Sequence, residues 1–207
     1  MPEIKNIIFD LGGVLMNIDY DRTTSAFLKL GVTDFKEMYS QVSANKVFEK
    51  FETGHISEDH FYDHMANKGS KPLNPLQVRD AWNAMILDFR LESFQFLKTL
   101  KTKYNLYLLS NTNVIHKSAF EKIYIQQTGL TSIDIFFTKT YYSHILGLRK
   151  PNSNIFEFVL EDAGLVPEET LFIDDSSGNV ITAKKSGIKT HLLLPGEKIE
   201  NLDYDII

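Results

Sequence analysis

The stretch Ile7-Ile8-Phe9-Asp10-Leu11-Gly12-Gly13-Val14 joins a short apolar run to one carboxylate and two adjacent glycines. A short apolar run without alternation is typical of a strand that is buried on both faces. A carboxylate at the end of such a strand is costly to bury unless it is paired or binds a metal, although Asp10 could also cap a helix or turn. Gly12 and Gly13 permit close approach of the backbone, where N–H groups can hold an anion. We therefore expect a buried strand that ends at a functional site.

Further apolar runs of the same kind predict the rest of a sheet. They are Leu106–Leu109, Leu171–Ile173 and His191–Leu194, with a weaker fifth candidate at Ile133–Phe137. Helical patterns lie between the later runs, at Leu91–Lys103, Ser153–Ala163 and Asn179–Ser186, and Gly187 marks the end of the last one. Strands that alternate with helices indicate an α/β fold with a doubly wound parallel sheet.

The stretch from Tyr20 to Asp88 has a different character. It shows no convincing strand and contains several helical segments, including Arg22–Leu30 and Asp34–Glu49. A helical insertion of this length after the first core strand is typical of a lid. We therefore expect a catalytic core of residues 1–17 and 90–207 and an α-helical cap of residues 18–89.

Composition narrows the function classes. The formal net charge is −5 and no Lys/Arg run stands out, which argues against a nucleic-acid-binding protein. The chain contains no cysteine, so a disulfide framework, a thiolate nucleophile and a Cys-ligated zinc are excluded. No apolar run is long enough to span a bilayer, and the N-terminus lacks the apolar segment of a signal peptide. We expect a cytoplasmic protein. A monomer is compatible with the sequence, which does not indicate an oligomeric state.

Polar groups follow the predicted strands at the edge where parallel sheets bind ligands. Ser110 and Asn111 follow the second run, and Asp174 and Asp175 follow a later one. Adjacent carboxylates repel each other unless a cation lies nearby, and hard oxygen ligands with an open position suit Mg²⁺. Taken singly, Ser110 could be a helix N-cap, one aspartate could cap the following helix, and Lys150 could be a solvated lysine.

The four segments around Asp10, Ser110, Lys150 and Asp174-Asp175 resemble, in this order and spacing, the haloacid dehalogenase superfamily of hydrolases. The resemblance covers nearly the whole chain and is strongest to the branch with a small α-helical cap, including sugar-phosphate phosphatases with a similar Asp-Leu-Gly opening. It implies a Mg²⁺-dependent phosphatase that acts on a small phosphorylated metabolite. No membrane or nucleic-acid partner is implied.

The resemblance also implies roles for individual residues. Asp10 matches the nucleophile that forms an aspartyl-phosphate, Ser110 the hydroxyl that binds phosphoryl oxygens, and Lys150 the cation that holds both groups. Asp10, Asp174, Asp175 and the backbone carbonyl of Gly12 would bind the metal. Phosphate or substrate contacts are expected from Gly12, Gly13, Asn111 and Arg22, although an exposed ion pair with Asp19 or Asp21 is the ordinary role of such an arginine.

Position 12 departs from the family pattern. The family's phosphatases usually carry a second aspartate two residues after the nucleophile as general acid/base, whereas Gly12 stands here. Losing such a group typically costs roughly 10²–10⁴-fold in rate. Asp19, Asp21 or His116 could substitute for it. The departure also leaves two alternatives, a 2-haloacid dehalogenase that uses the same nucleophile without Mg²⁺, and a catalytically weak phosphate-binding relative.

The predicted cap carries further candidates. Glu49 and Glu52 could bind sugar hydroxyls, although surface carboxylates on a helix are the ordinary interpretation for either. His60 and His64 have helical i, i+4 spacing, yet the remaining ligands of a zinc site are missing, so we expect surface histidines. The sequence does not identify the substrate and suggests no function for the segment 195–207.

Overall fold

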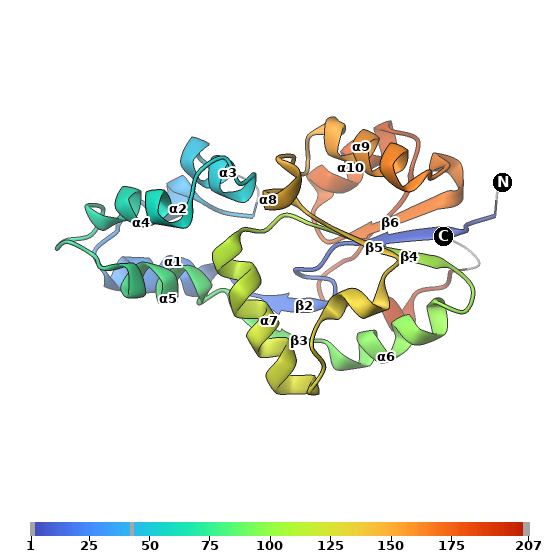
Figure 1. Ribbon diagram of the computed structural model, residues 1–207, viewed down its shortest axis with the longest axis horizontal. Helices are drawn as coiled ribbons and strands as arrows, with labels where there is room; N and C mark the ends of the chain where they lie inside the picture. The colour runs from blue at the N-terminus through green and yellow to red at the C-terminus, as the bar shows by residue number, and fades with distance from the viewer. Residues whose placement is uncertain (1–2, 42–43, 205–207) are drawn as a thin grey trace.

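A computed structural model of the chain describes residues 3–41 and 44–204, and its centre is a parallel five-stranded sheet (Figure 1). The strand order is β5-β4-β1-β6-β7, so the chain builds outward from β1 on one side before it returns to the other. This order creates a switch point beside β1, where open α/β sheets bind ligands. The predicted doubly wound parallel sheet is confirmed. Its strands are β1 (Asn6–Phe9), β4 (Asn105–Ser110), β5 (Lys139–Tyr142), β6 (Thr170–Asp174) and β7 (Lys189–Leu192).

Helices cover both faces of the sheet (Figure 1). The side chains of Ile7 and Phe9 pack into the core beneath α6 (Leu91–Leu100) and α7 (Val114–Thr128). Ile8 points to the opposite core, beneath α9 (Ser153–Ala163) and α10 (Ser177–Lys185). Because successive strand residues point to opposite faces and both faces are covered, all three side chains are buried. Two-sided burial is the reason for the unbroken apolar runs in the sequence.

The helical insertion (residues 19–85) lies beside the sheet and has an aromatic core (Figure 1). Phe48 is central to this core, with ring centroids 5.2 Å from Trp82 and 5.4 Å from Phe61. Local signals start its helices, as in the capping box that Asn74 and Gln77 form. The helices are α1 (Tyr20–Lys29), α2 (Phe35–Met38), α3 (Lys46–Glu52), α4 (Glu58–Ala66) and α5 (Pro75–Asn83).

A two-stranded antiparallel ribbon joins the helical insertion to the rest of the chain. Its strands are β2 (Met16–Ile18) and β3 (Ile86–Phe89), and Met16 pairs with Phe89. The expectation of no strand between Tyr20 and Asp88 is therefore wrong. The pairing joins segments about 70 residues apart, so no local pattern reveals it.

Three other predicted elements differ from the structure. Ile133–Phe137 is not a strand, because Ile133–Phe136 forms a 3₁₀ helix whose Phe136 packs against Phe94 of α6 at 5.1 Å. The fifth strand is β5, immediately after it, and β7 lies two residues earlier than expected. The single helix expected at Asp34–Glu49 is replaced by α2 and α3, with residues 42–43 outside the described part of the chain.

The segment after β7 packs on the core as far as Tyr204. Ile199 is fully buried, Glu200 accepts a hydrogen bond from the Ser93 hydroxyl at 2.8 Å, and the Tyr204 ring lies 5.9 Å from Phe96. This segment therefore covers the α6 side of the core. The remaining short elements are α8 (Ser143–Leu146), η2 (Pro167–Glu169) and η3 (Ile199–Asn201).

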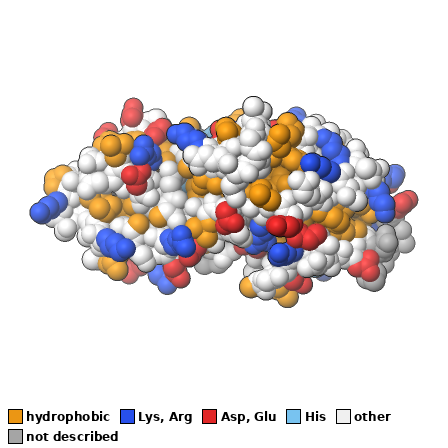
Figure 2. Space-filling view, turned by 90° about the horizontal axis from the view of Figure 1, so that it is seen from below, with side chains coloured by type: hydrophobic (Ala, Val, Ile, Leu, Met, Phe, Trp, Pro, Cys, Tyr) orange, Lys and Arg blue, Asp and Glu red, His pale blue; other side chains and the backbone are white. Residues whose placement is uncertain are grey.

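Surface charge is mixed. On the face shown in Figure 2, acidic and basic side chains of the described residues are interspersed along both the helical insertion and the sheet region. Among residues 3–41 and 44–204, no helix has the length and apolar character needed to cross a bilayer.

Candidate active site

The carboxyl ends of β1, β4 and β6 meet at a pocket of about 500 Å³ that the helical insertion also lines. Asp10 follows β1 and Ser110 ends β4, as the sequence predicts. The predicted site residues that line the pocket are Asp10, Gly12, Ser110, Asn111, Lys150 and Asp175. Asp174 is not part of the lining but accepts a hydrogen bond from Lys150.

Lys150 is the buried cation of this pocket, with 1% of its side chain exposed. Its Nζ donates to Asp10 Oδ1 at 2.8 Å and to Asp174 Oδ2 at 2.7 Å. Burial by itself lowers the pKa of Lys150, but the charges of the two aspartates outweigh it and raise that pKa. Lys150 therefore stays protonated over the physiological pH range.

Asn111 holds the backbone of Lys150 in place. Its Nδ2 donates to the Lys150 carbonyl at 2.8 Å, and the Lys150 N–H donates to Asn111 Oδ1 at 2.9 Å. Both ends of the Asn111 side chain are thus used within the protein. These two bonds link β4 to the loop that carries Lys150, and the second N–H of Nδ2 is left for the phosphate contact that the sequence predicts.

Asp174 is fully buried and held by several donors. Asn179 Nδ2 lies 3.0 Å from each of its carboxylate oxygens, and the Ser176 N–H donates to Oδ1 at 2.7 Å. Sequence reasoning missed Asn179. The available signal was an amide in the first turn of α10, five residues after the strand-end carboxylate.

Three carboxylates form a compact acidic cluster. Asp10, Asp174 and Asp175 offer oxygens that all lie within 4.8 Å of one another. Burial, together with repulsion from the other two carboxylates and despite Lys150, raises the pKa of Asp10 to about 7. Burial and Asp174 raise the pKa of Asp175 to about 6. A divalent cation would relieve this repulsion, and hard oxygen donors suit Mg²⁺, so the residues fit the metal that the sequence predicts.

His60 and His64 do not join such a site. Within the described part of the chain, the acidic cluster is the only group of three or more potential metal ligands that lie close together. The side chains of these histidines belong to α4, away from the pocket.

The two glycines after Asp10 serve different purposes. Gly13 has φ +76°, and a Cβ there would lie 2.2 Å from Asp175 Oδ2, so only glycine fits. Gly13 does not line the pocket, and its role is this close approach. At Gly12 a Cβ would lie 3.0 Å from Ile18 Cδ1. The side chain of Ile18 therefore occupies the space beside Gly12.

Arg22 is not brought to the pocket. Its side chain is 61% exposed and pairs with Asp19 at 3.5 Å, and both residues line a separate shallow groove between α1 and α5. Asp19 also caps α1 by accepting from the Asp21 N–H. The structure therefore does not place Arg22 at the pocket where a substrate contact was expected, and Asp19 and Asp21 do not line this pocket either.

His116 lines the pocket but is committed to the fold. Its ring stacks on Trp82 at 4.4 Å, and Nε2 lies 3.1 Å from the Trp82 carbonyl. Burial lowers the pKa of His116 to about 4, so the imidazole is neutral near pH 7. A neutral ring whose N–H is already bonded is a poor general acid.

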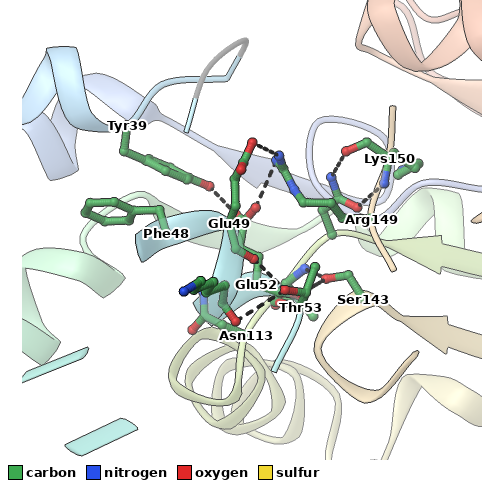
Figure 3. Close-up of polar contacts among 12 residues, drawn as sticks. Tyr39, Phe48, Glu49, Glu52, Thr53, Asn113, Ser143, Arg149 and Lys150 are labelled. Atoms are coloured by element: carbon green, nitrogen blue, oxygen red, sulfur yellow. Dashed lines mark hydrogen bonds and ion pairs between the residues drawn. The ribbon is translucent and has the colours of Figure 1, made fainter. Parts of the chain in front are cut away.

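The helical insertion supplies a second set of polar side chains to the pocket (Figure 3). Glu52 is 3% exposed, accepts from the Tyr39 hydroxyl at 2.7 Å, and pairs with Arg149 at 2.9 Å. The surface position expected for Glu52 is therefore wrong. Gln41 Nε2 donates to Asp175 Oδ2 at 3.0 Å, which links the insertion to the acidic cluster.

Comparisons with known proteins agree with the fold. Residues 4–187 match the family model for haloacid dehalogenase-like hydrolases, and the chain belongs to this family. A D-ribitol-5-phosphate phosphatase from Bacteroides thetaiotaomicron is 34% identical over 187 residues, which cover 90% of each chain.

Solved structures extend the likeness. A haloacid dehalogenase family enzyme from Bacteroides thetaiotaomicron, crystallised as an aspartate-to-alanine variant with magnesium and inorganic phosphate, is 36% identical with a TM-score of 0.88. The match covers 95% of this chain and 96% of that one. The L-2-haloacid dehalogenase RSc1362 shares the fold alone, with 15% identity and a TM-score of 0.59 over 98% of this chain and 92% of that one.

Proposed function

We propose that this hydrolase is a Mg²⁺-dependent phosphatase that acts on a small phosphate ester through an aspartyl-phosphate on Asp10. The observation that carries the proposal is the placement of Lys150, whose Nζ bridges Asp10 and Asp174 at 2.8 and 2.7 Å beside Asp175. A nucleophilic carboxylate, a fixed cation and a metal-binding acidic cluster are the parts that phosphoryl transfer requires.

The chemistry follows from these positions. Lys150 holds Asp10 Oδ1, which leaves Oδ2 to attack phosphorus and form the P–O bond while the bond to the leaving group breaks. The Ser110 hydroxyl makes only a long contact of 3.4 Å with the Asn111 carbonyl, so it can turn toward the phosphoryl oxygens. Water then attacks the aspartyl-phosphate, which releases phosphate and regenerates Asp10. A bound Mg²⁺, held by Asp10, Asp174, Asp175 and the Gly12 carbonyl, supplies charge neutralisation.

We propose that the cap comprises residues 18–89, which are the helical insertion with Ile18 and β3, and that residues 1–17 and 90–207 form the core. Tyr39, Gln41, Glu49 and Glu52 from the insertion line the same pocket as Asp10, which limits the substrate to a small molecule. The polar lining suits a phosphorylated sugar or polyol. The relative named as a D-ribitol-5-phosphate phosphatase supports this substrate class. We place the reaction in the cytoplasm.

A 2-haloacid dehalogenase remains the second candidate because of Gly12. An aspartate nucleophile can displace halide from carbon without a second carboxylate at that position. The compact cluster of Asp10, Asp174 and Asp175 favours the phosphatase, because displacement of halide from carbon has no need of a divalent cation.

The test is phosphate release from a panel of small sugar and polyol phosphates, with Mg²⁺ and with EDTA. Wild type and Asp10→Asn are compared, because an amide is a poor nucleophile and the two side chains have the same shape. We expect Mg²⁺-dependent release that the variant lacks. Undiminished hydrolysis by Asp10→Asn would refute the nucleophile, and metal-independent halide release from 2-haloacids would support the second candidate.

A further inference from the structure

Arg149 lies between two carboxylates of helix α3 (Figure 3). Its Nη2 pairs with Glu52 Oε2 at 2.9 Å, and its Nη1 lies 3.5 Å from Glu49 Oε1. Only 18% of the Arg149 side chain and 3% of the Glu52 side chain are exposed, whereas half of the Glu49 side chain is. The Glu52–Arg149 pair is therefore the buried element of this group, and it crosses from the helical insertion to the loop before α9.

Further contacts dock the same end of α3 onto the sheet region. The Ser143 hydroxyl donates to the Glu52 carbonyl at 2.6 Å and accepts from the Thr112 N–H at 2.9 Å. Gly54 follows α3 with φ +67°, and a Cβ there would lie 2.2 Å from the His144 carbonyl. The end of α3 is thus in direct backbone contact with α8 and is tied to the loop after β4.

Arg149 immediately precedes Lys150 in the chain. The backbone of Lys150 is clamped on one side by the Asn111 amide. The Arg149 side chain anchors the same loop on the other side, through Glu52. Glu52 Oε1 is itself held by the Tyr39 hydroxyl at 2.7 Å. A continuous set of contacts therefore leads from Tyr39 in the insertion to the Nζ that bridges Asp10 and Asp174.

We propose that Glu52 and Arg149 are a positioning pair, which holds α3 over the pocket and fixes the loop that carries Lys150. The inference rests on the proposed phosphatase function. Both residues line the pocket, but in this proposal they act through Lys150, because Arg149 Nη1 and Nη2 face two carboxylates and the Glu52 oxygens face Tyr39 and Arg149. A bidentate-capable arginine is suited to this role, since its planar donors fix an orientation that a lysine leaves free.

The first experiment compares kcat and KM for phosphate release by wild type, Glu52→Gln, Arg149→Met and the double variant. A misplaced catalytic group costs on the order of 100-fold in rate. We expect each single variant to lower kcat by roughly 10–100-fold, with KM changed far less. The double variant should be no worse than the poorer single one, because contacting residues are not additive. Arg149→Lys keeps the positive charge but lacks the paired donors of the guanidinium, so its kcat should lie between those of Arg149→Met and wild type.

The matched control is Lys139→Met. It breaks the Lys139–Asp162 ion pair, which has a similar length of 2.6 Å but is more exposed and lies away from the pocket. We expect wild-type kcat and KM from this variant. A rise in KM with unchanged kcat in Arg149→Met would instead make Arg149 a substrate ligand, and independent, additive losses would show that the two residues do not act as a pair. Either result overturns the proposal.

A second measurement does not depend on turnover. Trp82 is the only tryptophan and is fully buried. It lies on α5 of the helical insertion and stacks on His116 of α7. Loosening α3 should expose it, so acrylamide should quench its fluorescence more strongly in Glu52→Gln and Arg149→Met than in wild type or Lys139→Met. An inactive wild type would refute the proposed function while this comparison still decides the docking, and equal quenching in all variants would refute the positioning pair.

Discussion

The missing acid/base group can be restored at position 12 by design if the neighbouring side chain of Ile18 is made smaller. A Cβ at position 12 would meet Ile18 Cδ1 at 3.0 Å, while the next contacts, with Cγ2 and Cγ1 of Ile18, lie at 3.6 and 3.8 Å. Ile18→Val removes the one close atom and leaves ordinary van der Waals distances. Ile→Val changes typically cost about 0.5–1.5 kcal/mol of stability, an upper range for this half-buried side chain. Gly12→Asp combined with Ile18→Val is therefore expected to fold.

The expected gain depends on the leaving group. A positioned general acid contributes roughly 10²–10⁴-fold, which corresponds to about 2.7–5.5 kcal/mol of barrier. Alkyl phosphates, whose alkoxide leaving groups need a proton, should be hydrolysed at least about 10-fold faster by the Gly12→Asp/Ile18→Val variant. Esters of acidic phenols should change little. Gly12→Asp alone should gain less, because Ile18 must first move by a few tenths of an ångström.

The assay is phosphate release across esters of graded leaving-group pKa, with kcat/KM plotted against that pKa. The matched control is Gly12→Ala/Ile18→Val, which adds the same Cβ without a carboxylate. The Asp variant should give a flatter dependence on leaving-group pKa than the Ala variant. If both double variants give parallel lines of equal height, an acid at position 12 has no role in this pocket and the reasoning fails.

Three further outcomes are expected. Because the pKa of His116 is about 4 in the folded chain and about 6.5 when unfolded, the unfolded chain takes up the proton first. The contribution of His116 to stability is therefore lost as pH falls from about 6.5 to 4, by about 3 kcal/mol in full, so in urea unfolding the stability of His116→Gln should rise relative to that of wild type over this pH range. Gly13→Ala should lower kcat/KM by about 100-fold or more, since its Cβ would displace Asp175 and misplace a metal ligand, and wild-type kinetics would contradict this. Arg22→Ala should leave kcat and KM within about twofold of wild type, because loss of the exposed Arg22–Asp19 ion pair has little effect. A large rise in KM would instead show that Arg22 contacts the substrate.

The central sheet could be predicted because burial of a strand on both faces leaves a pattern within a few consecutive residues. Ile7, Ile8 and Phe9 are apolar at every position since both faces of β1 are covered, and a strand-end carboxylate is unusual enough to mark a site. The run Ile133–Phe137 failed for the converse reason. Its apolar side chains are buried by a 3₁₀ helix against α6, and burial alone does not specify a strand.

Features that depend on tertiary pairing were not readable from the sequence. Glu52 has the spacing of an ordinary helix-surface carboxylate, and its burial depends on two tertiary partners, the Tyr39 hydroxyl and Arg149, which lies almost 100 residues later. Arg22 lies outside the pocket, because proximity in sequence to Asp10 does not place its side chain on the pocket side of α1. Asn111 was correctly placed beside the site, but its amide is used to hold Lys150.

The β2–β3 ribbon has a consequence for how this chain can be re-engineered. Since Met16 pairs with Phe89, the polypeptide leaves and re-enters the sheet region at adjacent positions. The covalent connections of the segment between them thus lie side by side, so its length can change without stretching the scaffold, and loop-closure entropy grows only slowly with length. Grafting the corresponding segment of another family member between Ile18 and Ile86 should therefore give a folded chimera. Such a graft must preserve the residues of the insertion that contact the sheet region away from the β2–β3 ribbon, above all Glu52, the partner of Arg149.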